Sequence, residues 1–284
     1  MNNLVIKIRI FLKKYFPKLY NLSLPLRNFI YKTFYTKNSE INLSKEFLEF
    51  VPNVSGDIDK KDENTIYNIK NFSKSASNLF NSKVSIENLN TLSKSNERKL
   101  GDLFNKYGSD KRTHEYDYLY EMIIGSFDKI ELLVEIGIGS NNKEIISNMS
   151  EYGKPGASLR AFRDFLSDAN IVGLEYDKNV LFEENNIKTF FYDQNSNESV
   201  EKFSEIYKDK VDILIDDGLH SIVANINSIY LAESILKKDG YLIIEDISQS
   251  SINLYKIIFE LVKDSFDTKF YTNKSCLIST LRKK

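Results

Sequence analysis

The sequence predicts an α/β fold for residues 98–284, with a mostly parallel sheet that ends in an antiparallel C-terminal hairpin. Apolar segments that favour strands alternate with amphipathic segments that favour helices along this part of the chain. Such alternation implies right-handed crossovers and a parallel sheet that is buried on both faces. The C-terminal residues instead hold two strand-like segments around a short turn, which is typical of a hairpin.

Five apolar segments are the strand candidates of the parallel sheet. In chain order they are residues 131–139, 169–177, 187–193, 211–217 and 240–246. Helical segments lie between them, including SLRAFRDFLSD after the first strand and IVANINSIYLAESILKK after the fourth. The segments DTKFYT and CLISTLRK around the turn TNKS predict the hairpin, and its antiparallel strand is expected at the edge of the sheet.

The composition excludes several classes of protein. Lys and Arg number 39 and Asp and Glu number 40, so a net charge of -1 argues against a general nucleic-acid binder. A hydrophobic content of 42% is sufficient for a core. The single cysteine, Cys276, rules out an intramolecular disulfide and favours a reducing, cytoplasmic location. The chain has only two histidines, His114 and His220, which argues against a His-rich zinc site.

A helical N-terminal extension is predicted before the α/β domain. Residues 1–50 form a basic amphipathic arm, within which residues 1–37 hold eight Lys or Arg and no acid. Apolar runs there are shorter than the roughly 18 residues needed to span a bilayer. Three interpretations stay open: an arm lying peripherally on an anionic inner membrane face, a helix packed on another subunit of a homo-oligomer, or disorder. Residues 51–97, rich in Asn, Ser and Lys, are predicted to be a linker with some helical content.

The predicted strands all end in acidic residues, at the rim where ligands bind in open parallel sheets. After the first strand, Gly137 and Gly139 allow a ligand to approach the backbone closely. Glu175 ends the second strand, where an acid can accept hydrogen bonds from ribose hydroxyls. The third glycine of a nicotinamide-binding motif is missing, and a long loop precedes the helix that holds Ser158. This pattern suits a nucleoside without phosphates, and S-adenosylmethionine is the candidate. The candidate cofactor-binding residues are Glu135, Gly137, Gly139, Ser158, Glu175, Asp193, Gln194 and Asp216.

Three further acids favour a metal site. Asp217 follows the fourth strand, Glu245 and Asp246 end the fifth, and these two strands are expected to be neighbours. Three carboxylates this close repel one another unless a positive charge lies between them. Oxygen donors without a nearby cysteine favour Mg²⁺ as the cofactor, ahead of Mn²⁺ or Ca²⁺. A simpler interpretation stays open, in which Asp-Gly marks a turn and Glu-Asp caps the next helix.

His220 is the candidate catalytic residue. A cation beside a methyl donor can lower the pKa of an acceptor hydroxyl, and a neighbouring base must then take the proton. His220 lies three residues after Asp217, and imidazole titrates close to neutral pH. The alternative is a histidine at a helix start with no catalytic role.

Several separated motifs resemble those of a known family. In order they are EIGIGSNN, GKPGASLRAFRDFLSDANIVGLEYD, FFYDQ, DILIDDGLH and GYLIIEDI, and KYGSDKRTHEYDYLYEMI resembles the segment before the first strand. The family is the metal-dependent sugar O-methyltransferases, which include macrolide-sugar enzymes and proteins of bacterial surface-polysaccharide clusters. The resemblance covers roughly residues 98–250. It implies a Rossmann-like class I methyltransferase sheet, and an S-adenosylmethionine- and Mg²⁺-dependent O-methyltransferase that acts on a sugar hydroxyl of a glycan or other small-molecule acceptor.

The resemblance also implies roles for individual residues. The positions that match its metal ligands are Asp217, Glu245 and Asp246, and His220 matches its general base. The positions that fall where the cofactor is held are Glu135, Gly137, Glu175, Asp193 and Gln194. Glu175 stands where relatives usually have Asp, a change that lengthens the side chain and keeps the acceptor.

Other functions stay open from the sequence. The acid pattern is also similar to that of cephalosporin hydroxylase-like proteins, and a methyltransferase for another small molecule or a non-catalytic, membrane-docked scaffold remains an alternative. Lys111 and His114 lie in the pre-strand segment with Tyr116 and Tyr120. Either they cover the cofactor or contact the acceptor, or the tyrosines are core and the charges solvated; no catalytic role is expected for them.

Overall fold

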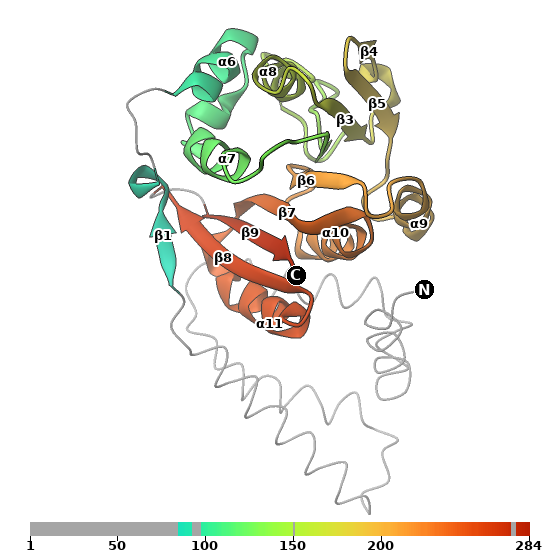
Figure 1. Ribbon diagram of the computed structural model, residues 1–284. Coiled ribbons are helices and arrows are strands. Elements are labelled where there is room, and N and C mark those ends of the chain that lie inside the picture. The colour runs from blue at the N-terminus through green and yellow to red at the C-terminus, as the bar shows by residue number, and fades with distance from the viewer. Residues whose placement is uncertain (1–84, 93–97, 150, 274–276) are drawn as a thin grey trace, which may run out of the picture. The chain divides into compact units, whose positions relative to one another are not determined.

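A computed structural model describes residues 85–92, 98–149, 151–273 and 277–284, and its main feature is a mixed sheet (Figure 1). The strands of this sheet are β1 (Ile86–Asn88), β2 (Leu132–Ile136), β3 (Asn170–Glu175), β4 (Glu183–Glu184), β5 (Ile187–Phe191), β6 (Val211–Asp216), β7 (Leu236–Ile247), β8 (Phe266–Thr272) and β9 (Leu277–Lys283). The helices are α6 (Lys99–Tyr107), α7 (Tyr116–Ile124), α8 (Ala157–Phe165), α9 (Asn197–Ile206), α10 (Ile222–Ile235) and α11 (Ile252–Val262).

The five predicted strands form the parallel centre of the sheet. The strand order is β1-β8-β9-β7-β6-β2-β3-β5-β4, and β5, β3, β2, β6 and β7 are parallel to one another. β2 lies between β3 and β6, so the chain order reverses there. In doubly wound sheets this reversal places a ligand crevice beyond the carboxyl ends of the central strands. The predicted α/β class and its mostly parallel sheet are confirmed.

The sequence analysis placed the antiparallel strand of the hairpin at the edge of the sheet, and this prediction is wrong. β8 and β9 form the predicted hairpin, but β9 lies between β7 and β8 and is antiparallel to both. Residues 277–281 of β9 are all buried, as expected for a strand with neighbours on both sides. β8 is therefore further out, and it pairs in parallel with β1, which comes from the segment predicted as linker.

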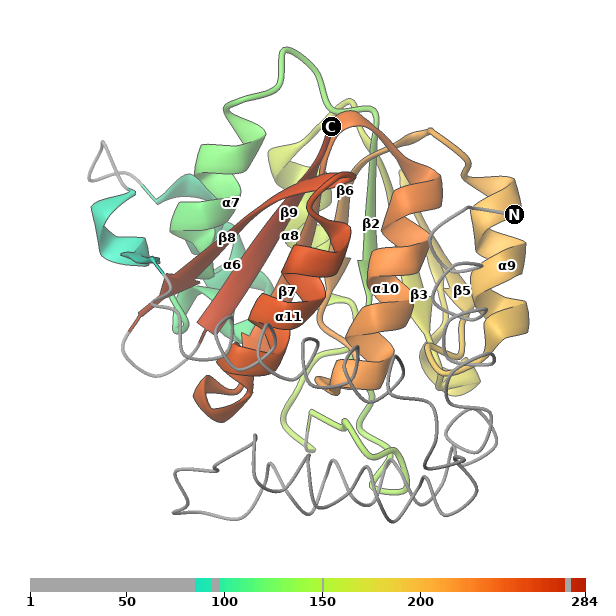
Figure 2. The same ribbon diagram turned by 90° about the horizontal axis from the view of Figure 1, so that it is seen from below.

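Helices cover both faces of the sheet (Figures 1 and 2). α6, α7 and α8 lie on one face, and α9 and α10 lie on the other. Under the first group, the rings of Phe104, Tyr120 and Phe162 meet edge to face, with centroids 5.2–6.2 Å apart. Each such pair contributes about 0.5–1.5 kcal/mol beyond the burial of its apolar area. This cluster fixes α7 against the sheet, which matters because α7 also contributes to the site.

Short polar residues define where the helices begin and end. Ser196 and Ser221 cap α9 and α10, because their side chains accept hydrogen bonds from the N–H groups of Ser199 and Ala224. Gly108 ends α6 in the left-handed region, with φ of 86°, where glycine is favoured. The α10 cap is functionally relevant, since it closes the loop that follows β6.

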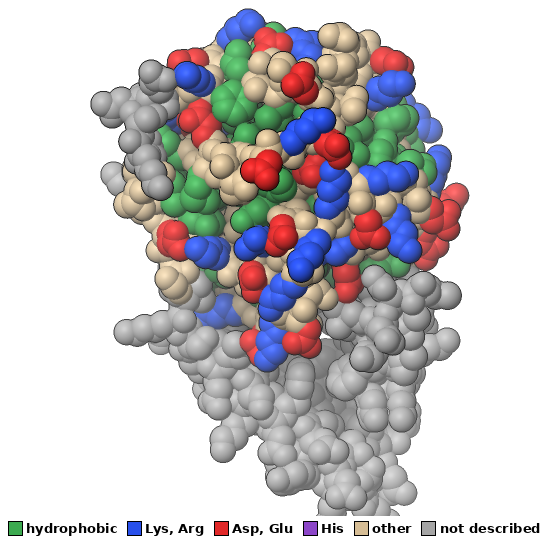
Figure 3. Space-filling model, viewed as in Figure 1, with side chains coloured by type: hydrophobic (Ala, Val, Ile, Leu, Met, Phe, Trp, Pro, Cys, Tyr) green, Lys and Arg blue, Asp and Glu red, His purple; other side chains and the backbone are tan. Residues whose placement is uncertain are grey.

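The chain divides into two compact units. One comprises residues 84–249 and 258–284 and holds the sheet, and the other comprises residues 1–83 and 250–257. The predicted basic arm and most of the predicted linker lie outside the described residues. Within the described part of the chain, no helix has the length and apolar character that a membrane crossing requires. On the face shown in Figure 3, acidic and basic side chains are interspersed, in keeping with the net charge of -1.

Candidate functional site

The predicted metal site lies at the carboxyl ends of β6 and β7. These strands pair in parallel with Asp216 opposite Ile244, so the residues that follow lie side by side. Asp217 directly follows β6, while Glu245 and Asp246 are among the last three residues of β7. The neighbouring positions that the sequence analysis expected for these two strands are confirmed.

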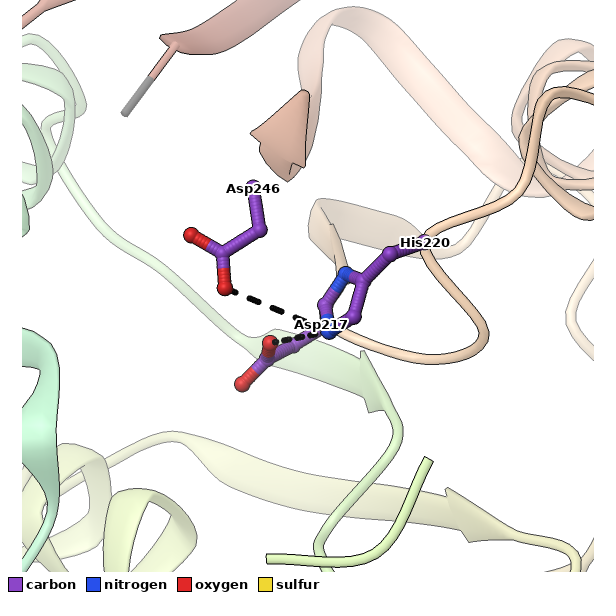
Figure 4. A group of neighbouring side chains, drawn as sticks. All are labelled: Asp217, His220 and Asp246. Carbon is purple, nitrogen blue, oxygen red and sulfur yellow. Dashed lines mark ion pairs between the residues drawn. The ribbon is translucent and has the colours of Figure 1, made fainter. Parts of the chain in front are cut away.

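Asp217, His220 and Asp246 point toward one another (Figure 4). His220 Nε2 lies 3.7 Å from Asp217 Oδ1 and 4.0 Å from Asp246 Oδ2. One ligand atom from each of the three residues lies within 4.8 Å of the other two. Two carboxylate oxygens and one imidazole nitrogen this close fit a small divalent cation, and oxygen-rich donor sets favour Mg²⁺ or Mn²⁺.

Two of these three residues have an unusual backbone conformation. The φ angles of His220 and Asp246 are 47° and 51°, in the left-handed region that most non-glycine residues avoid. Asp and His enter this region more readily than other residues, at a cost of order 1–3 kcal/mol. In this conformation the side chains of both residues point toward Asp217 (Figure 4).

Glu245 occupies a different environment from the other predicted metal ligands. Both of its carboxylate oxygens lie 2.8 Å from the Nζ of Lys111, which is also 2.7 Å from Asp217 Oδ2. The same ammonium lies 3.1 Å from Glu135 Oε1. Lys111 is only 2% exposed, so its charge is fully engaged by these acids. The positive charge between the carboxylates, which their repulsion requires, is in this structure that of Lys111.

Burial dominates the electrostatics of this cluster. Burial raises the pKa of Glu245 well above its usual range, and the charge of Asp217 raises it further. Burial also raises the pKa of Asp217, against the opposite effect of Lys111. Burial alone would lower the pKa of Lys111, but the charges of Asp217, Glu245 and Glu135 together raise it well above its ordinary value. The cluster therefore holds a charged lysine and more acid than one lysine can neutralise.

Helix α7 contributes two tyrosines to the same acids. Tyr116 donates a hydrogen bond to Asp246 Oδ1, and Tyr120 donates one to Glu245 Oε1. The two tyrosines are four residues apart, so both lie on one face of α7. The sequence analysis did not assign these hydrogen bonds. The i, i+4 tyrosine pair opposite a Glu-Asp pair was the signal for them.

The loop after β6 is held by a buried polar network. Gln194 donates to Asp216 Oδ1 at 2.8 Å and accepts from the N–H of Leu219 at 3.0 Å. Asn225 of α10 donates to the other oxygen of Asp216 at 2.7 Å. Asp216 and Gln194 were predicted to bind a cofactor. In this structure their side chains bind the loop that carries Asp217 and His220, so Asp216 helps to orient this loop.

The other predicted cofactor residues lie along the ends of β2, β3 and β5. Ser158, in the first turn of α8, donates to Glu135 Oε2 at 2.6 Å, so these two side chains lie together. Glu175 accepts backbone N–H groups of Ile138, Tyr176 and Asp177. The longer Glu side chain thus folds back on its own loop, although two oxygens can accept further hydrogen bonds. Asp193 accepts from the N–H of Asn195 in the turn after β5.

The two glycines after β2 have separate structural roles. Gly137 has a φ of 84°, and a Cβ there would lie 2.1 Å from the carbonyl oxygen of Asp217. Gly139 has a φ of 89°, and a Cβ there would lie 2.5 Å from the side chain of Met149. Gly137 therefore allows the β2 and β6 ends to pack directly, and Gly139 allows the following loop to fold over the β2 end.

His114 packs beside Tyr116 of α7. Its ring stacks on Tyr116 with centroids 5.5 Å apart, and its Nε2 is 3.6 Å from Asp110 Oδ2. Of the pair singled out in the segment before the first strand, Lys111 therefore joins the acids and His114 supports Tyr116.

Comparison with solved structures identifies the fold. MycE methyltransferase from the mycinamycin biosynthetic pathway, in complex with Mg and SAH, superposes with a TM-score of 0.52 and 21% identity over 65% of this chain and 54% of that chain. A second MycE structure, with Mg, SAH and mycinamycin VI, gives a TM-score of 0.51 and 21% identity over 66% of this chain and 55% of that one. The chain has the class I methyltransferase fold. It spans about half the length of these MycE chains. No protein-family model and no curated protein matches the sequence.

Proposed function

We propose that the protein is an S-adenosylmethionine- and Mg²⁺-dependent O-methyltransferase that acts on a sugar hydroxyl. The observation that carries the proposal is the convergence of Asp217, His220 and Asp246 at the ends of two adjacent strands. The fold supports it, because MycE, with the same fold, was crystallised with Mg and SAH. Neither the fold nor the acids alone would indicate the reaction, but they occur together at the rim where this class of sheet binds ligands.

The cation would be bound by Asp217, Glu245 and Asp246. Oxygen atoms of Asp217 and Asp246 lie close together, and Lys111 Nζ is within 2.8 Å of both Asp217 and Glu245, so the Glu245 carboxylate is also near. The cofactor would lie along the ends of β2 and β3, beside Glu135, Ser158 and Glu175. Two polar side chains that meet at the β2 end support this placement, because Ser158 of α8 donates a hydrogen bond to Glu135 there.

The chemistry would divide between the ligands and the chain. When bound, S-adenosylmethionine supplies an electrophilic methyl group, and the cation lowers the pKa of the acceptor hydroxyl. His220 would take the proton of that hydroxyl as the oxygen–methyl bond forms and the sulfur–methyl bond breaks, leaving S-adenosylhomocysteine. The His220 side chain is one-third exposed, so an acceptor can reach Nε2, and it lies beside both predicted ligands.

The sugar acceptor is the finer part of the proposal. It is supported by the sequence motifs shared with sugar O-methyltransferases and by the MycE structure that contains mycinamycin VI. We infer a role in bacterial surface glycan or glycoconjugate biosynthesis from the same motifs. A small glycoside acceptor would approach His220 and Asp246 from solvent, since Lys111 contacts Asp217 and Glu245 from the interior of the protein.

A methyl-transfer assay with and without chelator tests the proposal. Purified full-length protein is mixed with methyl-labelled S-adenosylmethionine, Mg²⁺ and a panel of glycosides, and the labelled product is measured. We expect transfer that is lost with a chelator and restored by Mg²⁺. Transfer unaffected by the chelator would overturn the metal role, and calorimetry showing no binding of S-adenosylmethionine at millimolar concentration would overturn the methyltransferase proposal.

A further inference from the structure

The ammonium group of Lys111 contacts carboxylate oxygens that would bind a cation in the proposed function. Its Nζ contacts Asp217 Oδ2 and both oxygens of Glu245, which are two of the three proposed ligands. We propose that Lys111 is a built-in counter-ion that competes with the divalent cation for Asp217 and Glu245. It is thus a positioning residue that sets cation affinity. This inference rests on the proposed function, because it requires a divalent cation at these acids.

The charge of the cluster favours exchange of one cation for another. Four carboxylates gather at this end of the sheet, those of Glu135, Asp217, Glu245 and Asp246, and Lys111 supplies one positive charge among them. A buried, uncompensated carboxylate is costly, so the cluster without any cation would be strongly destabilised. Lys111 therefore stabilises the acids when no divalent cation is bound, and a divalent cation would neutralise Asp217 and Glu245 better than the ammonium does.

Glu135 gives the displaced ammonium another partner. Glu135 Oε1 is 3.1 Å from the Nζ of Lys111, yet the pair lacks good hydrogen-bond geometry and this oxygen has no hydrogen-bond partner among the described residues. A small rotation of the lysine side chain toward Glu135 would complete that bond. The charge of Lys111 would then stay paired after Asp217 and Glu245 had turned to the cation.

The tyrosines of α7 would hold the acids during this exchange. Tyr120 donates to Glu245 and Tyr116 donates to Asp246, both from one face of a helix that is fixed by aromatic packing. Both carboxylates thus keep one hydrogen bond that does not depend on Lys111. The site can lose its lysine contacts without losing the position of its proposed ligands.

Calorimetric titration of Mg²⁺ and Mn²⁺ into full-length protein tests the competition without any measurement of activity. Lys111→Met removes the ammonium and keeps an apolar chain of similar length. We expect its dissociation constant for the cation to fall about tenfold or more relative to wild type, because a repelling charge within about 4 Å is removed. Lys106→Met is the matched control, since Lys106 is an exposed residue of α6 that pairs with Asp164, and its affinity should equal that of wild type.

A charge-matched variant covers the case in which Lys111→Met does not fold. Lys111→Met with Glu135→Gln removes one positive and one negative charge and leaves the proposed ligands unchanged. The same gain in affinity is expected in this variant. Equal or weaker affinity in both Lys111 variants, with measurable binding in wild type, would overturn the competition and leave the metal site standing. Absence of cation binding in every variant would overturn both this inference and the metal-dependent function.

Discussion

At the scale of single residues, His220 has two possible roles that its position alone does not separate. Its Nε2 faces Asp217 and Asp246 closely enough to be a metal ligand, and an imidazole at that point could instead take the proton of an acceptor hydroxyl. A base acts on turnover, whereas a ligand acts on cation affinity. The two roles can therefore be separated by measuring both quantities.

We expect His220→Ala to lower kcat by about 100-fold or more and to change cation affinity little, because the base is lost and the carboxylate ligands remain. Methyl-transfer kinetics and calorimetry with Mg²⁺ check the two parts. Lys106→Ala is the control, since Lys106 is an exposed residue of α6 that pairs with Asp164. If His220→Ala keeps wild-type turnover, His220 is not the base. If His220→Ala instead loses much of its cation affinity, His220 is a metal ligand.

The sequence identifies some of these residues and not others for a physical reason. Asp217, Asp246 and His220 could be predicted because each ends a strand or follows one, so their convergence follows from the parallel sheet. The contact of Lys111 with Glu245 joins positions 134 apart in the chain, from a short 3-10 helix to a strand. No local pattern reports such a contact. Only the requirement for a positive charge between the acids could be predicted, and the structure supplies Lys111 for it.

At the scale of elements, the packing of the β2 and β6 ends determines the site. The backbone of Gly137 lies against the carbonyl of Asp217, so no side chain fits between the two strand ends. The loop that carries His220 depends on this contact and on the Gln194–Asp216 network beneath it. The glycine that was predicted to admit a ligand therefore also admits the neighbouring strand.

Gly137→Ala should destabilise the protein by more than about 2 kcal/mol, since the left-handed φ is unfavourable for alanine and the Cβ would overlap the Asp217 carbonyl. Urea unfolding monitored by circular dichroism measures this. Gly125→Ala, at the end of α7 with a φ of -66°, is the control, and a much smaller effect is expected there. Equal stability losses in the two variants would contradict the proposed packing of the strand ends.

The hairpin shows where prediction of elements ends. The strands β8 and β9 and their turn could be predicted because a hairpin is local in the chain. The position of β9 between β7 and β8 depends on its pairing with β7, which is distant in the chain, and no local pattern reports that pairing. Residues 277–281 are all buried although Ser279 and Thr280 are polar, so the sequence did not indicate a strand with two neighbours.

At the scale of the whole molecule, the class I methyltransferase fold explains why the candidate residues gather at one edge of the sheet. It does not explain the role of the N-terminal segment. Residues 1–37 carry eight basic residues and no acid, outside the described residues. The two ordered interpretations differ in what they require. Attraction to anionic lipid depends on the charges and weakens with salt, while packing on a second subunit depends on the apolar residues.

Flotation with liposomes distinguishes these interpretations in the full-length protein. We expect wild type to float with phosphatidylserine-containing vesicles at low salt, and replacement of Lys7, Arg9, Lys13 and Lys14 by Gln to abolish flotation, because each basic residue near an anionic surface contributes about 1 kcal/mol. The matched control replaces four exposed lysines of the sheet-bearing unit by Gln, at Lys106, Lys129, Lys188 and Lys263. Both variants lose the same net charge, so only position differs. Equal flotation of all three proteins would contradict binding through the arm. If wild type does not float at low salt, sedimentation of the same samples separates the two interpretations that remain: a dimer or larger species indicates subunit packing, and a monomer indicates disorder.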